Sequence, residues 1–149
     1  MPIRPADIVT YHDWAATQLL DALERAPQAP ARAVSLLSHV IAAEHVWHER
    51  VEGRIAQIAF WPDFDLPRLR ELAVHNLEDW QRTLSRDDLD RVIAYRNSKG
   101  IAYETPIQEI LLHLLSHGAY HRGQITEAMR EAGLPLLNTD FIVYLRQRD

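Results

Sequence analysis

Apolar residues recur every three to four positions in four separate stretches of the chain, which is the pattern of amphipathic helices. The stretches span residues 6–25, 31–58, 66–85 and 106–132. Pro27 and Pro30 interrupt the pattern between the first two stretches, and Gly133 with Pro135 ends the last one. The pattern therefore predicts four long helices joined by short connections.

One stretch between the third and fourth helices has the character of β-strands. Residues 91–96 and 101–104 are rich in β-branched and aromatic side chains, and they flank the turn-forming sequence Asn-Ser-Lys-Gly at 97–100. An isolated hairpin is only marginally stable, so this one must pack against the helices. The predicted fold is all-α: an antiparallel four-helix bundle with a small β-hairpin between helices 3 and 4, in a single domain spanning residues 1–149.

Two helix starts carry capping signals. Asp65 is the predicted N-cap of the third helix. Thr105 is the predicted N-cap of the fourth, with Pro106 at the first helical position and Gln108 completing a capping box.

Three histidines lie four residues apart on the predicted fourth helix: His113, His117 and His121. At 3.6 residues per turn they form one stripe, and the apolar residues between them indicate that it faces the core or a cleft. The two ends of the stripe are roughly 12 Å apart along the axis. One adjacent pair is therefore a better chelate than all three, and a third ligand must come from elsewhere.

Several motifs resemble those of the DinB/YfiT-like family of metal-binding four-helix bundles. They are His39 followed eight residues later by Trp47, the sequence His-Gly-Ala-Tyr-His-Arg-Gly-Gln at 117–124, and the terminal segments 11–15 and 139–145. The resemblance covers essentially the whole chain. In that family three histidines bind a divalent metal, and the resemblance implies that the ligands here are His39, His117 and His121. His113 matches a position that is not counted among the ligands.

The remaining histidines have weaker claims to a role. His113 is interpreted as a neighbour of the site. At 100° per residue, His45 and His48 lie about 240° and about 180° around the second helix from His39, so both are expected at the surface. His12 and His75 have no spacing that implicates them.

Polar residues near the stripe are candidates to support it. Metal-binding histidines usually donate their second N–H to a carboxylate or carbonyl, and Glu109, Ser116 and Gln124 lie within about a turn of the stripe. Arg122 is expected in an ion pair or at the rim of the site. Gly118 costs about 1 kcal/mol of helix propensity, so a close contact beside the site is expected to compensate.

Composition excludes several classes of function. The 149 residues include no cysteine, which excludes disulfides, cysteine-based zinc sites and a thiol nucleophile, and which fits a cytoplasmic location. The net charge is −5 with acids and bases interspersed, so no nucleic-acid surface is expected. The sequence contains no run of 18 apolar residues, so no membrane span is expected.

Three imidazoles leave a tetrahedral ion one open position, which is typical of catalytic sites. Neutral nitrogen ligands favour zinc or nickel, with iron as a further choice. The family resemblance implies a metal-dependent transferase that uses a low-molecular-weight thiol as co-substrate and acts on a small molecule. A metal-water hydrolase and a non-catalytic metal- or ligand-binding stress protein remain as alternatives. The resemblance also implies a homodimer, which the aromatic loop at Phe60, Trp61 and Phe64 favours.

Overall fold

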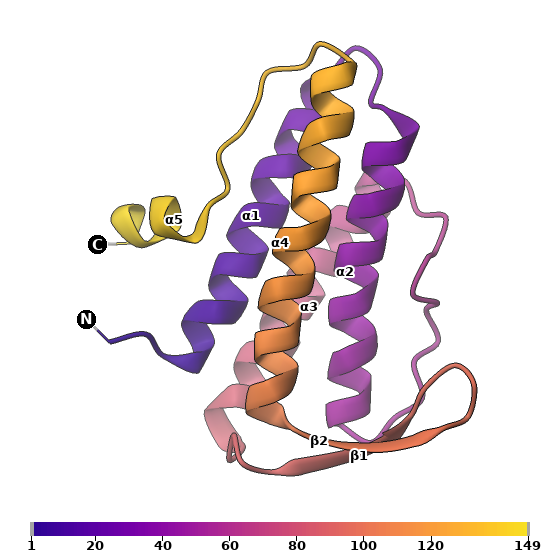
Figure 1. Cartoon of the computed structure of the whole chain (residues 1–149), viewed down its shortest axis with the longest axis vertical. Coiled ribbons are helices and arrows are strands. Elements are labelled where there is room, and N and C mark those ends of the chain that lie inside the picture. The colour runs from indigo at the N-terminus through magenta and orange to yellow at the C-terminus, as the bar shows by residue number, and fades with distance from the viewer. Residues whose placement is uncertain (1, 149) are drawn as a thin grey trace.

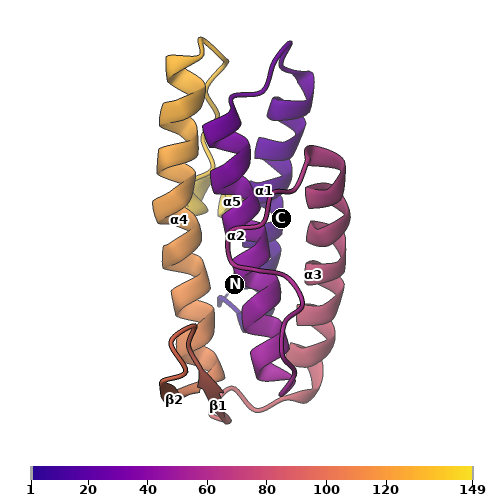
Figure 2. The ribbon, with the colours of Figure 1, turned by 90° about the vertical axis from the view of Figure 1, so that its right-hand side faces the viewer.

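A computed structural model of the chain describes residues 2–148 and is mainly helical, as the sequence predicts. The elements, in chain order, are α1 (Pro5–Arg25), α2 (Ala31–Val51), α3 (Leu66–Arg86), β1 (Val92–Arg96), β2 (Ala102–Pro106), α4 (Ile107–Glu131) and α5 (Phe141–Gln147). The four long helices lie side by side along the long axis of the molecule (Figures 1 and 2). No helix within the described residues is long and apolar enough to cross a membrane.

The core forms where the apolar faces of α1, α2, α3 and α4 meet. Leu19, Leu37, Leu69 and Ile125 come from these four helices in turn and are completely buried in one cluster. Each buried side chain of this size stabilises the fold by about 1.5–3 kcal/mol relative to an exposed one. The three-to-four-residue spacing of apolar positions thus becomes one continuous interior.

The β-hairpin connects α3 to α4 at one end of the helices (Figure 1). β1 and β2 pair antiparallel, with Ala94 opposite Glu104. Gly100 adopts a φ of +78°, which the turn requires and which L-residues rarely adopt. Ile93 is 3% exposed and packs into the core near Trp80, so the hairpin is anchored to the helices.

Helix α2 ends at Val51, seven residues before the predicted end at 58. Gly53 has a φ of +72° and its N–H donates to the Arg50 carbonyl, while the N–H of Arg54 donates to Glu49, so the last turn is closed off there. Beyond this end, Ile55 is 86% exposed, so the apolar residues that follow do not continue a buried helical face. The extended segment that follows runs back along α2 (Figure 2).

The two predicted N-caps have different outcomes. Asp65 caps α3 as predicted, because its carboxylate accepts from the N–H of Arg68 at 3.0 Å. Thr105 does not cap α4: the helix starts after Pro106, and the Thr105 side chain instead contacts the Tyr95 hydroxyl at 3.0 Å. Pairing of β2 with β1 extends the strand through Pro106, so α4 begins one residue too late for Thr105 to be its N-cap.

A short fifth helix, α5, was not predicted. It packs against α1 through aromatic rings, with the rings of Tyr11 and Phe141 4.8 Å apart and those of Tyr11 and Tyr144 5.5 Å apart. The Tyr11 hydroxyl donates to the carbonyl of Thr139 at 2.6 Å and fixes the segment that leads into α5.

Candidate metal centre

Three histidines from two helices converge where α2 packs against α4. His39 comes from α2, and His117 and His121 come from α4. One ring nitrogen of each lies within 4.8 Å of the others, and Nε2 of His117 is 3.0 Å from Nε2 of His39. Two nitrogens bound tetrahedrally to one ion at about 2.1 Å are roughly 3.4 Å apart. These side chains therefore fit one divalent ion after small rotations.

Helix geometry alone brings two of the three histidines together. Residues four apart on a helix are neighbours on its surface, and the rings of His117 and His121 have centroids 4.6 Å apart. His39 reaches the pair from the neighbouring helix α2, with its ring centroid 4.8 Å from each. The third side chain thus depends on how α2 packs against α4.

Two of the three rings are oriented by hydrogen bonds. Nδ1 of His39 lies 2.6 Å from the carbonyl oxygen of Phe60, and Nδ1 of His121 lies 2.7 Å from Oε1 of Gln124. An oxygen acceptor at Nδ1 requires the proton there, which leaves the Nε2 lone pair free for a metal. Gln124 is thus the predicted supporting residue that reaches a ring, whereas the Ser116 hydroxyl donates to the His113 carbonyl.

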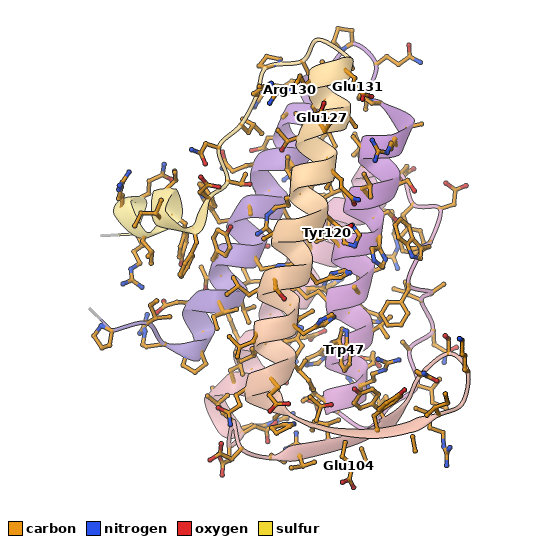
Figure 3. All side chains as sticks on the ribbon, in the orientation of Figure 1. Trp47, Glu104, Tyr120, Glu127, Arg130 and Glu131 are labelled. Atoms are coloured by element: carbon orange, nitrogen blue, oxygen red, sulfur yellow. The ribbon has the colours of Figure 1, made fainter. Side chains whose placement is uncertain are left out.

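Aromatic side chains border the cluster on its solvent side. The ring of Trp61 stacks on His39 with centroids 3.8 Å apart and planes 1° apart, and Trp61 is 56% exposed. Tyr120 is also largely exposed, and its ring lies 5.0 Å from that of His121 (Figure 3). Because His117 and His121 are themselves only half-buried, a small molecule can reach them from this side.

Burial keeps the imidazoles of His39 and His117 neutral. Desolvation, reinforced by the neighbouring histidines, lowers the pKa of His117 to about 4. Desolvation also lowers the pKa of His39, although the hydrogen bond to Phe60 opposes the shift. A neutral imidazole is the form that binds a metal, so these two rings are ready to bind at neutral pH.

His113 stands beside the cluster rather than in it. Its ring centroid lies 5.3 Å from that of His117 and 5.4 Å from that of Trp47, which lies between α2 and α4 nearer the hairpin (Figure 3). Burial, followed by the positive charge of Arg50, lowers the pKa of His113. The prediction of a neighbouring role agrees with this placement.

The prediction for His48 was wrong. This residue is 3% exposed, and Nε2 of its ring lies 2.9 Å from the Thr83 hydroxyl of α3. Helix α2 packs against α3 as well as α4, so a side chain on the face away from His39 is still buried. His45, which was also predicted at the surface, is half-buried, and His75 is exposed.

Sequence reasoning also missed a buried polar group behind the cluster. His12 of α1 is 2% exposed and Glu44 of α2 is 4% exposed, and their Nε2 and Oε2 atoms are 3.3 Å apart. Burial lowers the pKa of His12 to about 3 and raises that of Glu44 well above its usual value. Arg122 lies here too: it is 3% exposed, not at the rim, and donates to the Tyr11 hydroxyl at 2.9 Å.

The fold and the convergent side chains define a mainly helical protein with a candidate three-histidine metal centre. The model of the DinB family matches residues 7–149, so the chain belongs to this family and the resemblance seen in the sequence is confirmed. Protein DinB of Bacillus subtilis (strain 168) is 28% identical over 154 residues, which cover 91% of this chain and 90% of that protein.

Proposed function

We propose that this chain is a metal-dependent enzyme, a single-domain antiparallel four-helix bundle that binds one divalent ion through His39, His117 and His121. The main support is the convergence of three ring nitrogens, one from each histidine, within 4.8 Å. Three neutral nitrogens suit zinc or nickel first, and iron as a further choice. We also propose a cytoplasmic location, because a chain without cysteine suits a reducing compartment.

Three protein ligands leave one coordination position open on a tetrahedral ion. A divalent ion held there would act as a Lewis acid and lower the pKa of a water molecule or thiol in the open position. The half-buried His117 and His121 expose this position to small molecules, and Trp61 and Tyr120 flank the approach.

The reaction class we propose is transfer of a low-molecular-weight thiol to a small electrophile. Because the chain has no cysteine, the thiol must be a co-substrate. The family resemblance supports a transferase over the two alternatives, a metal-water hydrolase and a non-catalytic metal- or ligand-binding stress protein. A transferase should consume an electrophile only when thiol is present and lose this activity on chelation. Turnover without thiol would identify a hydrolase, and metal binding without turnover would identify a binding protein.

The ligand assignment is tested by metal content. Protein purified without a histidine tag should contain one divalent ion per chain, and His39→Ala, His117→Ala and His121→Ala should each lower metal affinity at least tenfold, because each removes one of three bonds. His113→Ala, in the same stripe, is the matched control and should keep its metal. Full occupancy in the first three folded variants, or an empty site in His113→Ala alone, would show that the assignment is wrong.

A further inference from the structure

One of the three proposed ligands has no partner for its second ring nitrogen. His39 and His121 use Nδ1 to contact Phe60 and Gln124, but Nδ1 of His117 is buried and has no hydrogen-bond partner within residues 2–148. A buried donor without a partner costs about 1–3 kcal/mol. Metal-binding histidines almost always donate this N–H.

Two other buried side chains with unpaired nitrogens lie next to His117. They are Arg122, at Nη1, and His12, whose Nδ1 has no partner and whose Nε2 faces Glu44 at 3.3 Å without the geometry of a hydrogen bond. Both rest against the α4 backbone at the adjacent residue, Gly118. A Cβ atom there would lie 2.6 Å from Nη1 of Arg122, 2.8 Å from Cε1 of His12 and 2.9 Å from its Nδ1. Only glycine leaves room for these groups.

His12 and Arg122 differ in whether they can accept a hydrogen bond from His117. When Nε2 of His117 binds a metal, its Nδ1 bears the proton and needs an acceptor. The guanidinium of Arg122 has donors only, whereas a neutral imidazole has one acceptor nitrogen. His12 is therefore the partner that this N–H can use.

Glu44 determines which nitrogen of His12 accepts. Its Oε2 lies 3.3 Å from Nε2 of His12, and both side chains are shielded from solvent. Oε2 can accept the Nε2–H of His12 whether the carboxyl group is ionised or carries a proton on its other oxygen. With the ring proton on Nε2, Nδ1, the nitrogen close to Gly118, is the acceptor. These positions run from Glu44 on α2 through His12 on α1 to Gly118, the residue next to His117 on α4.

We propose that His12, oriented by Glu44, accepts the Nδ1 hydrogen bond of His117, directly or through one water molecule, and so positions this ring for the metal. The inference rests on the proposed metal site. His12 and Glu44 are positioning residues and not ligands. If they were only a buried polar pair between α1 and α2, their replacement would change stability but not metal affinity.

The first test measures zinc affinity by competition with a chromophoric chelator. His12→Phe keeps a buried ring but removes the acceptor, and it should weaken zinc binding about 10- to 100-fold. His12→Gln keeps an acceptor and should recover most of this loss. His48→Phe is the matched control, because His48 is equally buried and lies 3.6 Å from the Glu52 carboxylate. It should bind zinc as tightly as the wild-type protein.

A second pair of variants displaces His12 without changing its chemistry. Gly118→Ala adds a methyl group where His12 and Arg122 lie, and it should weaken zinc binding. Gly123→Ala makes the same change in the same helix, where a Cβ would meet nothing within 4 Å. This control should leave zinc affinity unchanged.

Nuclear magnetic resonance keeps the inference testable if the variants at position 12 fail to fold. In the zinc-loaded wild-type protein, the Nδ1 proton of His117 should exchange slowly, and the Nδ1 nitrogen of His12 should have the shift of an unprotonated acceptor. Wild-type zinc affinity in folded His12→Phe, or a His117 proton that exchanges rapidly with water, would overturn the inference. Full zinc binding by His117→Ala would instead show that His117 is not a ligand and would overturn the proposed metal site.

Discussion

At the scale of single residues, burial determines the charge of the groups around the proposed metal centre. Desolvation holds the pKa of His12 at about 3 and, together with neighbouring histidines, that of His117 at about 4. Both are far below the 6.5 of an exposed imidazole. The pKa of Glu44 moves the opposite way for the same reason, because burial disfavours its carboxylate.

The depressed pKa of His12 predicts a specific pH dependence of stability in the metal-free protein. A group whose pKa is lowered by folding stabilises the native state above its unfolded pKa, and this contribution disappears as pH falls from about 6.5 towards about 3. The slope is about 1.4 kcal/mol per pH unit. The raised pKa of Glu44 acts in the opposite direction, with stability lost as pH rises above 4.5.

The pH dependence is tested by urea unfolding between pH 4 and 7 with chelator present. His12→Gln has no group that titrates at this position, so its stability should fall less steeply with acid than that of the wild-type protein. His75→Gln replaces an exposed histidine of α3 and should follow the wild-type curve. Parallel curves for wild type and His12→Gln would contradict the prediction.

The sequence reveals some residues of the candidate site and not others, for physical reasons. His117 and His121 can be identified from the sequence because residues four apart on a helix lie side by side on its surface. His39 required the family resemblance, because its distance to α4 depends on helix packing. His12 and Glu44 give no local signal, since only the tertiary structure brings them together.

At the scale of elements, helix interiors were predictable and helix ends were less so. The apolar spacing located all four long helices, but α2 was predicted seven residues too long, because the spacing does not show that the backbone becomes left-handed at Gly53. Helix α5 spans only Phe141–Gln147 and depends on contacts with α1, so periodicity could not identify it.

The hairpin is held to the helices by a stacked arginine. Arg50 of α2 places its guanidinium carbon 4.5 Å from the centroid of the Trp47 ring, 4.8 Å from that of Tyr95 and 5.3 Å from that of Phe60. It also donates to the carbonyl of Arg96 in β1 at 3.3 Å. One side chain therefore joins α2, the segment after it and the hairpin.

Arg50→Ala should loosen the hairpin more than the helices. Cation–π contacts contribute about 0.5–2 kcal/mol, and the loss should appear as faster hydrogen exchange at the amides shared by β1 and β2. Arg82→Ala is the control, because Arg82 is exposed on α3 and pairs with Asp79 of its own helix. Equal exchange rates for the hairpin amides in the two variants would contradict this function of Arg50.

At the scale of the whole molecule, the candidate centre forms only when distant parts of the chain meet. His39 and His117 are 78 residues apart in sequence and approach within 3.0 Å. They belong to α2 and α4, whose packing no local pattern determines. The resemblance to a known family supplied this long-range information, and for that reason the sequence pointed to the same three histidines that the structure brings together.

The homodimer stays a prediction. Leu112 and Tyr120, on α4, are 58% and 68% exposed, and their eight-residue spacing puts them on one face of the helix, about 12 Å apart. Pairing through this face would cover two large apolar side chains and border the candidate centre, because the Tyr120 ring lies 5.0 Å from that of His121. Light scattering should then show a dimer at micromolar concentration, and the double variant Leu112→Glu, Tyr120→Glu should be a monomer. Val74→Glu, which changes an equally exposed apolar residue on α3, should remain dimeric. A monomeric wild-type protein would refute the dimer, and a dimer that survives the double variant would place its interface on another face.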